Sequence, residues 1–358
     1  MGVELIQKTW LKLAQFLLFR AIEIMTYARR MISVHRFAVG LFFAATLFAA
    51  SAAEENYTIA VIPKGTTHEF WKSIHAGAVK AQQELKTRGV NVDIIWKGPL
   101  REDDRDQQIQ VVENFVARHV SGIVLAPLDS TALVRPVVTA AAANVPVVII
   151  DSALNTDKYR SIVATDNFKG GVIAGEELGR LLGGKGKVIL LRYAIGSAST
   201  ERREAGFLEA IKKLPGITIL SSDQHAGATR ELAYQASQNL LNRYGREVDG
   251  IFVPNESVTV GMAKALRDIG RAGGKVKLVG FDSGSLSVQD LKNGDVQALL
   301  VQNPLRMGYE GVMKVIDALD GKSVPKSIDT GVVLVTQGNM DKPDIQELLH
   351  PPLDKYLK

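Results

Sequence analysis

From residue 57 onward, short apolar runs alternate with longer segments in which apolar and polar residues recur at helical spacing. The short runs are rich in valine and isoleucine and are bounded by Gly, Pro, Asp or Asn, the pattern of strands buried on both faces. We therefore predict strands at residues 58–62, 91–96, 123–126, 147–150, 160–164, 187–192, 218–222, 250–254, 277–281, 298–302 and 331–336.

The longer segments carry apolar residues three and four positions apart, as on one face of a helix. They predict helices at 70–85, 104–118, 131–143, 167–182, 200–214, 228–244, 256–269, 285–293 and 304–319. Strands that alternate with helices on this scale indicate βαβ units and parallel sheets. The chain holds two comparable series, so the fold class is α/β with two doubly wound parallel-sheet lobes. The last elements are too few for a third domain, so we expect them to cross back and complete both sheets.

Gly171, Gly175 and Gly179 lie four residues apart on one face of the predicted helix at 167–182. In a soluble protein, small residues in this pattern indicate close packing, and we expect this helix to pack closely on the sheet.

Two adjacent aromatic residues, Phe70 and Trp71, end the polar loop after the first strand. In parallel α/β sheets, ligands bind beyond the carboxyl ends of the strands, which is where this loop is expected. Aromatic rings suit the C–H faces of sugars. The alternative is that both rings belong to the core, where buried aromatics are common.

Polar residues directly follow several predicted strands on both halves: Asp151, Asn255, Glu256, Asp282, Gln302 and Asn303. Carboxylates and amides form hydrogen bonds with hydroxyl groups, so these residues could converge on one ligand. The alternative for each one alone is a helix cap or a turn.

Motifs for most enzyme chemistry are missing. There is no cysteine, which excludes disulfides, thiolate metal sites and cysteine nucleophiles. Residues 179–185 match the start of a P-loop, but Gly186 replaces the Ser/Thr that binds magnesium and the run precedes a strand. We find no dinucleotide fingerprint, no nucleophile elbow and no zinc motif, so no cofactor or metal is predicted. An α/β enzyme with Asp151 or Asp282 as general base remains an alternative.

The first 52 residues differ from the rest. Arg29, Arg30 and Arg36 precede an apolar run at 37–50 and a small-residue site at 50–53, the pattern of a cleaved signal peptide at 31–52. Residues 1–30 are then a non-structural extension, with an amphipathic segment as the alternative. Without residues 1–52 the chain has 37 basic and 36 acidic residues, so its charge gives no support for nucleic-acid binding.

Over residues 57–340 the chain resembles the periplasmic sugar-binding proteins of ABC transporters, the ribose/galactose-type group. The resemblance depends on TIAVIPKGTTHEFWKSIHAGA, GIVLAPLDS, VPVVIID, ATDNFKGG, GSASTERREAGF, IFVPNES, LVGFDSGS and ALLVQNP. It implies two lobes joined by three hinge strands, each lobe discontinuous in sequence. The N-terminal lobe would be 53–164 plus 304–331, and the C-terminal lobe 165–303 plus 332–358.

The resemblance also implies the site residues. Phe70 and Trp71 would stack on the sugar with His68 beside them, Asp151, Asn255 and Asp282 would bind hydroxyls, and Gln302 would lie near the hinge. The implied function is that of a secreted, periplasmic, monomeric protein that closes on a small carbohydrate and delivers it to an ABC permease. A periplasmic sensor that presents its ligand to a receptor is the alternative within this class.

Three departures from the ribose pattern change the expected ligand. Ser152 and Glu201 stand where arginines are expected, with Arg203 just beyond, and Ala228 replaces an aromatic residue of the second lobe. Buried carboxylates disfavour an anionic guest unless bases offset them. We therefore expect a neutral or amino-substituted sugar or polyol, hexose-sized or larger, and neither ribose nor a sugar acid or phosphate.

Overall fold

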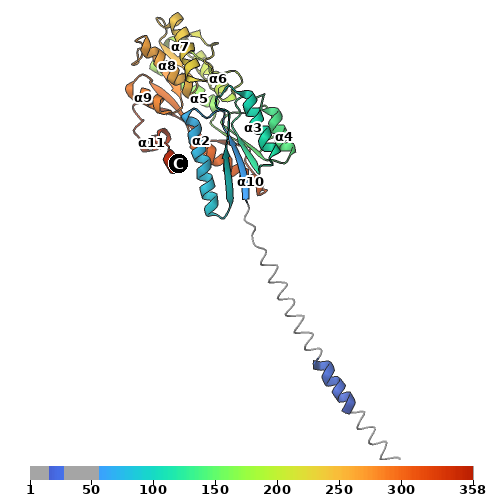
Figure 1. Cartoon of the computed structure of the whole chain (residues 1–358). Coiled ribbons are helices and arrows are strands. Elements are labelled where there is room, and N and C mark those ends of the chain that lie inside the picture. Colours follow the sequence, from blue (N-terminus) through green and yellow to red (C-terminus); the bar gives the residue numbers. More distant parts are fainter. Residues whose placement is uncertain (1–15, 28–55, 358) are drawn as a thin grey trace, which may run out of the picture. The chain divides into compact units, whose positions relative to one another are not determined.

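The computed structural model describes residues 16–27 and 56–357 (Figure 1). Residues 16–27 are helical with exposed side chains and form part of a unit separate from the one that begins at Asn56. The predicted signal peptide lies outside the described residues, as does the rest of the predicted extension. Within the described ranges, no helix is long and apolar enough to span a bilayer.

Residues 56–357 contain two six-stranded sheets of matching strand order. The first, of order β11-β5-β4-β3-β1-β2, defines the N-terminal lobe, and its neighbouring strands are all parallel. Its strands are β1 (Asn56–Ile62), β2 (Asn91–Trp96), β3 (Gly122–Leu125), β4 (Val147–Ile150), β5 (Ser161–Ala164) and β11 (Ser327–Asp329).

The second sheet, of order β12-β10-β9-β8-β6-β7, defines the C-terminal lobe. Its strands are β6 (Lys185–Leu190), β7 (Gly216–Ser221), β8 (Gly250–Phe252), β9 (Lys277–Phe281), β10 (Ala298–Gln302) and β12 (Val332–Val335). Only the last pair, β10 with β12, is antiparallel. The prediction of two parallel-sheet α/β lobes is confirmed.

Helices cover both faces of each sheet. The N-terminal lobe has α2 (Glu69–Thr87), α3 (Arg105–Ala117), α4 (Val134–Ala142) and α10 (Pro304–Leu319). The C-terminal lobe has α5 (Asn167–Leu181), α6 (Ala198–Lys212), α7 (Arg230–Tyr244), α8 (Glu256–Asp268) and α9 (Ser285–Asn293). Side chains of β1 alternate between two cores: Ile59 and Val61 pack with α2 and α10, whereas Ala60 and Ile62 pack with α3 and α4. Because both faces are buried there, the last four residues of the strand, 59–62, are all apolar.

Helix α5 packs on the second sheet through Ala174 and Leu178, but its glycine face packs against α6, so the prediction that the glycines face the sheet is wrong. A Cβ atom on Gly171 would lie 1.9 Å from the carbonyl oxygen of Arg203, and one on Gly175 would lie 2.7 Å from Cβ of Ala210. Gly77 and Gly308 allow the same close approach between α2 and α10. Glycine spacing shows that a helix face is close to a neighbour, but not whether that neighbour is a helix or a sheet.

The chain passes between the lobes three times: after β5, after β10 and after β11. Two of the crossings are hydrogen-bonded to each other. The Thr330 amide donates to the Ala164 carbonyl at 3.0 Å, and Thr165 Oγ1 donates to the Gly331 carbonyl at 3.0 Å. These bonds hold the crossing segments side by side where the lobes would hinge.

The last residues of the chain connect the lobes again. Helix α11 (Pro343–Leu349) packs near β10, whereas α12 (Leu353–Tyr356) packs on α2 of the N-terminal lobe (Figure 1). We call residues 350–357 the C-terminal strap. The sequence places them in the C-terminal lobe, but in the structure the strap lies against the other lobe.

Candidate functional site

One cavity between the lobes is lined by the eight residues predicted to bind the ligand: His68, Phe70, Trp71, Asp151, Arg203, Asn255, Asp282 and Gln302. Seven of them follow or end strands of the two sheets, at the carboxyl ends where the loops of the two lobes meet, and Arg203 lies on α6. Lys64, Glu102, Tyr193, Ser197, Ser199, Thr200 and Glu256 complete the lining.

The aromatic pair lies at the start of α2. Trp71 is only 3% exposed and packs in the core of the N-terminal lobe, while Phe70 is half-buried and meets it edge to face at 5.0 Å between ring centroids. Both rings also line the cavity. Trp71 therefore belongs to the core and also lines the cleft, which the sequence analysis had treated as alternatives. Phe70 is the more accessible of the two rings.

Glu102 connects side chains of both lobes. One carboxylate oxygen, Oε1, accepts from Trp71 Nε1 at 2.8 Å and lies 2.5 Å from His68 Nδ1. The other, Oε2, accepts from the Tyr193 hydroxyl of the C-terminal lobe at 2.8 Å. A buried carboxylate with this many donors is stabilised in its charged form.

The pKa values of this cluster reflect that arrangement. Burial alone would lower the pKa of His68, but the Glu102 carboxylate outweighs it and raises the pKa to about 9. Burial would raise the pKa of Glu102, but His68, with help from Lys64 and Trp71, lowers it to about 2. His68 and Glu102 therefore form a charged pair at neutral pH.

Asp151 and Asp282 occupy equivalent places in the two sheets, directly after β4 and β9. Both have positive φ, 63° and 70°, which is strained for a residue with a side chain and is often found at functional sites. Asp151 lies 2.8 Å from Lys64 Nζ. Asp282 accepts from Gln302 Nε2 at 2.7 Å and from the Glu256 amide at 3.0 Å. Burial, only partly offset by Arg203 and Gln302, raises the pKa of Asp282 to about 6.

Arg203 is the most deeply enclosed cation of the site, at 2% exposure. Its guanidinium lies 3.9 Å from the Phe281 ring centroid and donates to Asn167 Oδ1 and the Pro254 carbonyl, both at 2.8 Å. Among the described residues, nothing accepts from its Nη2, and nothing donates to Gln302 Oε1. The cavity therefore keeps one buried donor and one buried acceptor unused.

The capping alternative holds for the asparagines. Asn255 Oδ1 accepts from the Val258 amide at 3.3 Å and caps α8, although Asn255 also lines the cavity. Asn303 caps α10 by accepting from the Arg306 amide at 2.9 Å and is not part of the cavity lining. An asparagine directly after a strand is expected both for a helix cap and for a ligand-binding residue, so the sequence does not separate the two roles.

Most charges in and around the cavity are paired, and Arg203 and Asp282 are the exceptions among the described lining residues. Besides Lys64 with Asp151 and His68 with Glu102, Glu256 lies 2.5 Å from Arg230. The side chains also meet across the lobes, as where Lys64 Nζ donates to Ser199 Oγ at 3.1 Å. The side chains that meet across the lobes leave a cavity of only about 30 Å³. A sugar ring would therefore have to displace some of these contacts between side chains to enter. A site of this kind suits a polar guest without net charge.

The chain matches the family model of the periplasmic binding protein domain over residues 59–323. It belongs to the periplasmic binding protein family. A D-allose-binding periplasmic protein of Escherichia coli (strain K12) is 31% identical over 315 residues, which are 84% of this chain and 96% of that protein. A ribose import binding protein of Bacillus subtilis (strain 168) is 30% identical, over 80% of this chain and 90% of that protein.

A solved relative supports the same family. The structure of an ABC transporter solute-binding protein from Agrobacterium vitis with bound D-fucose has a TM-score of 0.77 and 34% identity, covering 82% of this chain and all of that one. The resemblance inferred from the sequence is confirmed. Within the family pattern, Ala228 is a core residue of the C-terminal lobe here, and Tyr193 is the aromatic that this lobe contributes to the cavity.

The sequence reasoning missed several residues of the site: Ser197, Ser199 and Thr200 at the start of α6, and the two that connect the lobes, Glu102 and Tyr193. Glu102 stands in the run Arg101-Glu102-Asp103-Asp104, which has the composition of an exposed loop. Nothing in that run distinguishes the one buried carboxylate from its exposed neighbours. Tyr193 follows shortly after β6, so the strand-end rule that found Asp151 and Asp282 would also have found it.

Proposed function

We propose that this chain is a periplasmic solute-binding protein that captures one neutral or amino-substituted sugar or polyol between its lobes. The observation that carries the proposal is the interlobe cavity, where eight residues chosen from the sequence meet. In it, Arg203 Nη2 and Gln302 Oε1 remain available to hydroxyl groups.

Binding would work through the hinge. A ligand held by Phe70 and Asp151 on one lobe and by Arg203 and Asp282 on the other interacts fully only when the lobes are closed. Its differential affinity then shifts the population toward the closed form, without a chemical step. Hinge closure of this kind is known for periplasmic binding proteins.

The charge of the cavity supports a ligand without net negative charge. Among the described residues, Arg203 is the only cation of the lining that forms no ion pair with a carboxylate; burial lowers its pKa, and Asp282 and Asp151 are close enough to oppose that shift. The relatives named above are described with D-allose, ribose and D-fucose, which are all neutral sugars. We expect the ligand here to be hexose-sized or larger.

A thermal-shift panel of neutral pentoses and hexoses, amino sugars, polyols, sugar acids and sugar phosphates tests this function. We expect a neutral or amino member to raise the melting temperature and to be recovered unchanged after denaturation. Stabilisation by anionic members alone would overturn the charge argument. Stabilisation by ribose alone would overturn the size argument, and conversion of the ligand would indicate an enzyme.

We further propose export to the periplasm and delivery of the ligand to an ABC permease by the monomer. The support is the leader pattern at 31–52 and the family. N-terminal sequencing of the exported protein should begin at Ala53 or Glu54. Ligand-dependent binding to the cognate permease in nanodiscs would support delivery, and binding to a chemoreceptor instead would favour a sensor.

A further inference from the structure

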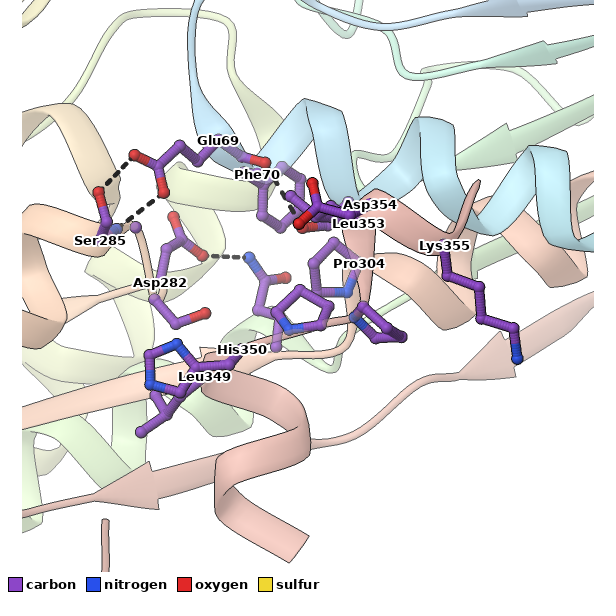
Figure 2. A pocket seen from close by; sticks show the side chains of 16 residues that line it. Glu69, Phe70, Asp282, Ser285, Pro304, Leu349, His350, Leu353, Asp354 and Lys355 are labelled. Carbon is purple, nitrogen blue, oxygen red and sulfur yellow. Dashed lines mark hydrogen bonds between the residues drawn. The ribbon is translucent and has the colours of Figure 1, made fainter. Parts of the chain in front are cut away.

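A second, larger cavity adjoins the interlobe cavity (Figure 2). Its volume is about 480 Å³, and it lies between the start of α2, the segment Asp282–Ser285 and the C-terminal strap. Phe70, Asp282 and Gln302 line both cavities, so the two are neighbours that share a wall of three side chains. We call this second space the strap cavity.

The lining of the strap cavity is mixed. Apolar surface comes from Phe70, Pro304, Leu349, Pro351, Pro352 and Leu353. Oxygen atoms come from Glu69, Asp282 and Ser285. Glu69 accepts from the amide and the hydroxyl of Ser285 at 2.9 and 2.6 Å, and Asp282 lies beside this pair (Figure 2). A lining that offers both apolar carbons and hydrogen-bonding oxygens suits a sugar ring, which has C–H faces and a hydroxyl edge.

The charges of the strap cavity disfavour an anion. Glu69, Asp282 and Asp354 contribute carboxylates, and the one lysine, Lys355, points away from the other labelled side chains (Figure 2). The space is in the range in which proteins bind small molecules, about 300–1,000 Å³. Gln302 belongs to the shared wall and is only 2% exposed. Its Oε1 accepts no hydrogen bond from the described residues, so it is available to a donor group of a ligand in either cavity.

From these observations we propose that the strap cavity is a second subsite, which binds the second ring of a neutral disaccharide or glycoside whose first ring lies between the lobes. This inference depends on the proposed function and narrows its ligand from a single sugar to a linked pair. The strap, which crosses from α11 to α2, would then form the outer wall of the extended site.

Isothermal titration calorimetry on the exported form of the chain tests the proposal. It compares neutral monosaccharides with larger ligands that contain the same monosaccharide at one end: disaccharides, alkyl glycosides and aryl glycosides. We expect at least one extended ligand to bind tenfold or more tightly than the monosaccharide it contains. Leu353→Trp fills the strap cavity without touching the interlobe cavity. It should reduce that advantage to within twofold and leave the monosaccharide Kd unchanged.

Val138→Trp is the matched control, because Val138 is 40% exposed on α4 and lines neither cavity. It should change neither Kd. If Leu353→Trp does not fold, a chain that ends at His350 removes the wall and should lose the same advantage. The second subsite would be overturned if a monosaccharide binds and no extended ligand binds more tightly. It would also be overturned if Leu353→Trp weakens the binding of both ligand sizes equally. Either result would leave the proposed function standing. Failure of every carbohydrate to bind would overturn both.

Discussion

His68 and Glu102 make the stability of the protein depend on pH in a defined direction. The pKa of His68 is raised to about 9 in the folded state, above the ordinary value of 6.5. Its stabilising contribution is therefore complete below pH 6.5 and is lost as the pH rises toward 9. Glu102, with a pKa lowered to about 2, stays charged throughout this window.

We therefore expect His68→Gln to lower the free energy of unfolding most at pH 6 and progressively less up to pH 9, as measured by urea denaturation. His75→Gln is the control, because burial lowers the pKa of His75 and its contribution is constant above pH 6.5. A His68→Gln effect of equal size at pH 6 and pH 9 would show that the pair is not charged.

The two rings at the start of α2 should respond differently to truncation. Trp71→Ala removes a ring that is 3% exposed, so it should lower the free energy of unfolding by about 3–5 kcal/mol. Phe70→Ala should reduce ligand affinity by about 0.5–1.5 kcal/mol through lost ring contact, with a smaller loss of stability. Calorimetry and urea denaturation separate the two effects, and unchanged affinity in Phe70→Ala would remove that ring from the site.

For individual residues, the sequence predicted which side chains lie at the cavity but not which other side chains they contact. Asp151 and Asp282 could be found because a polar residue directly after a buried strand must lie at the sheet edge that bears the loops. The pairing of Lys64 with Asp151, and of Glu102 with Tyr193, depends on how loops of distant segments meet. That meeting is a tertiary property and has no local signal.

At the scale of helices and strands, the close contact between α5 and α6 links the stability of the protein to the position of Arg203 in the site. Gly171 approaches the backbone of Arg203, so Gly171→Ala must push α5 and α6 apart and displace the buried guanidinium of Arg203. We expect a loss of about 1–3 kcal/mol in stability, the range for overpacking, together with weaker ligand binding. Differential scanning calorimetry and titration would measure both.

Gly338→Ala is the control for this substitution, because a Cβ there would meet only Thr336 Oγ1, at 3.7 Å. It should leave both quantities unchanged. If Gly171→Ala binds ligand normally, the helix crossing does not position Arg203.

Most elements could be predicted because their apolar spacing is strong. The strands at 91–96, 147–150, 277–281 and 298–302 and the helices at 285–293 and 304–319 have the predicted bounds, and the others shift by one to three residues. Within residues 56–357, three elements were missed: β11 (Ser327–Asp329), α11 (Pro343–Leu349) and α12 (Leu353–Tyr356). They are short, and β11 is a strand only because it pairs with β5 from far along the chain.

For the whole molecule, contacts that join the lobes outside the cavity should also affect affinity. Arg105 Nη2 donates to the Ile195 carbonyl of the other lobe at 3.0 Å, while its Nε lies 2.9 Å from Asp129. If this bond forms only when the lobes close, Arg105→Ala should weaken ligand binding about two- to tenfold, equivalent to roughly 0.5–1.5 kcal/mol.

Arg101→Ala is the matched control, because Arg101 pairs with Asp103 of its own lobe. It should leave the Kd unchanged. Small-angle scattering should also show a larger average radius of gyration for Arg105→Ala at subsaturating ligand. Equal effects of the two substitutions would mean that Arg105 acts through general electrostatics and not through closure.

The interleaving of the lobes has a consequence for how the chain acquires its structure. Helix α10 covers the same face of the first sheet as α2, and Tyr309 donates to Glu84 at 2.8 Å across a separation of 225 positions. The edge strand β11 arrives still later in synthesis. The N-terminal half therefore emerges from the ribosome with a bare apolar surface and stays incomplete until nearly the whole chain exists. We expect a polypeptide with contacts so distant in sequence to fold slowly and late, and such a delay would suit the export proposed above.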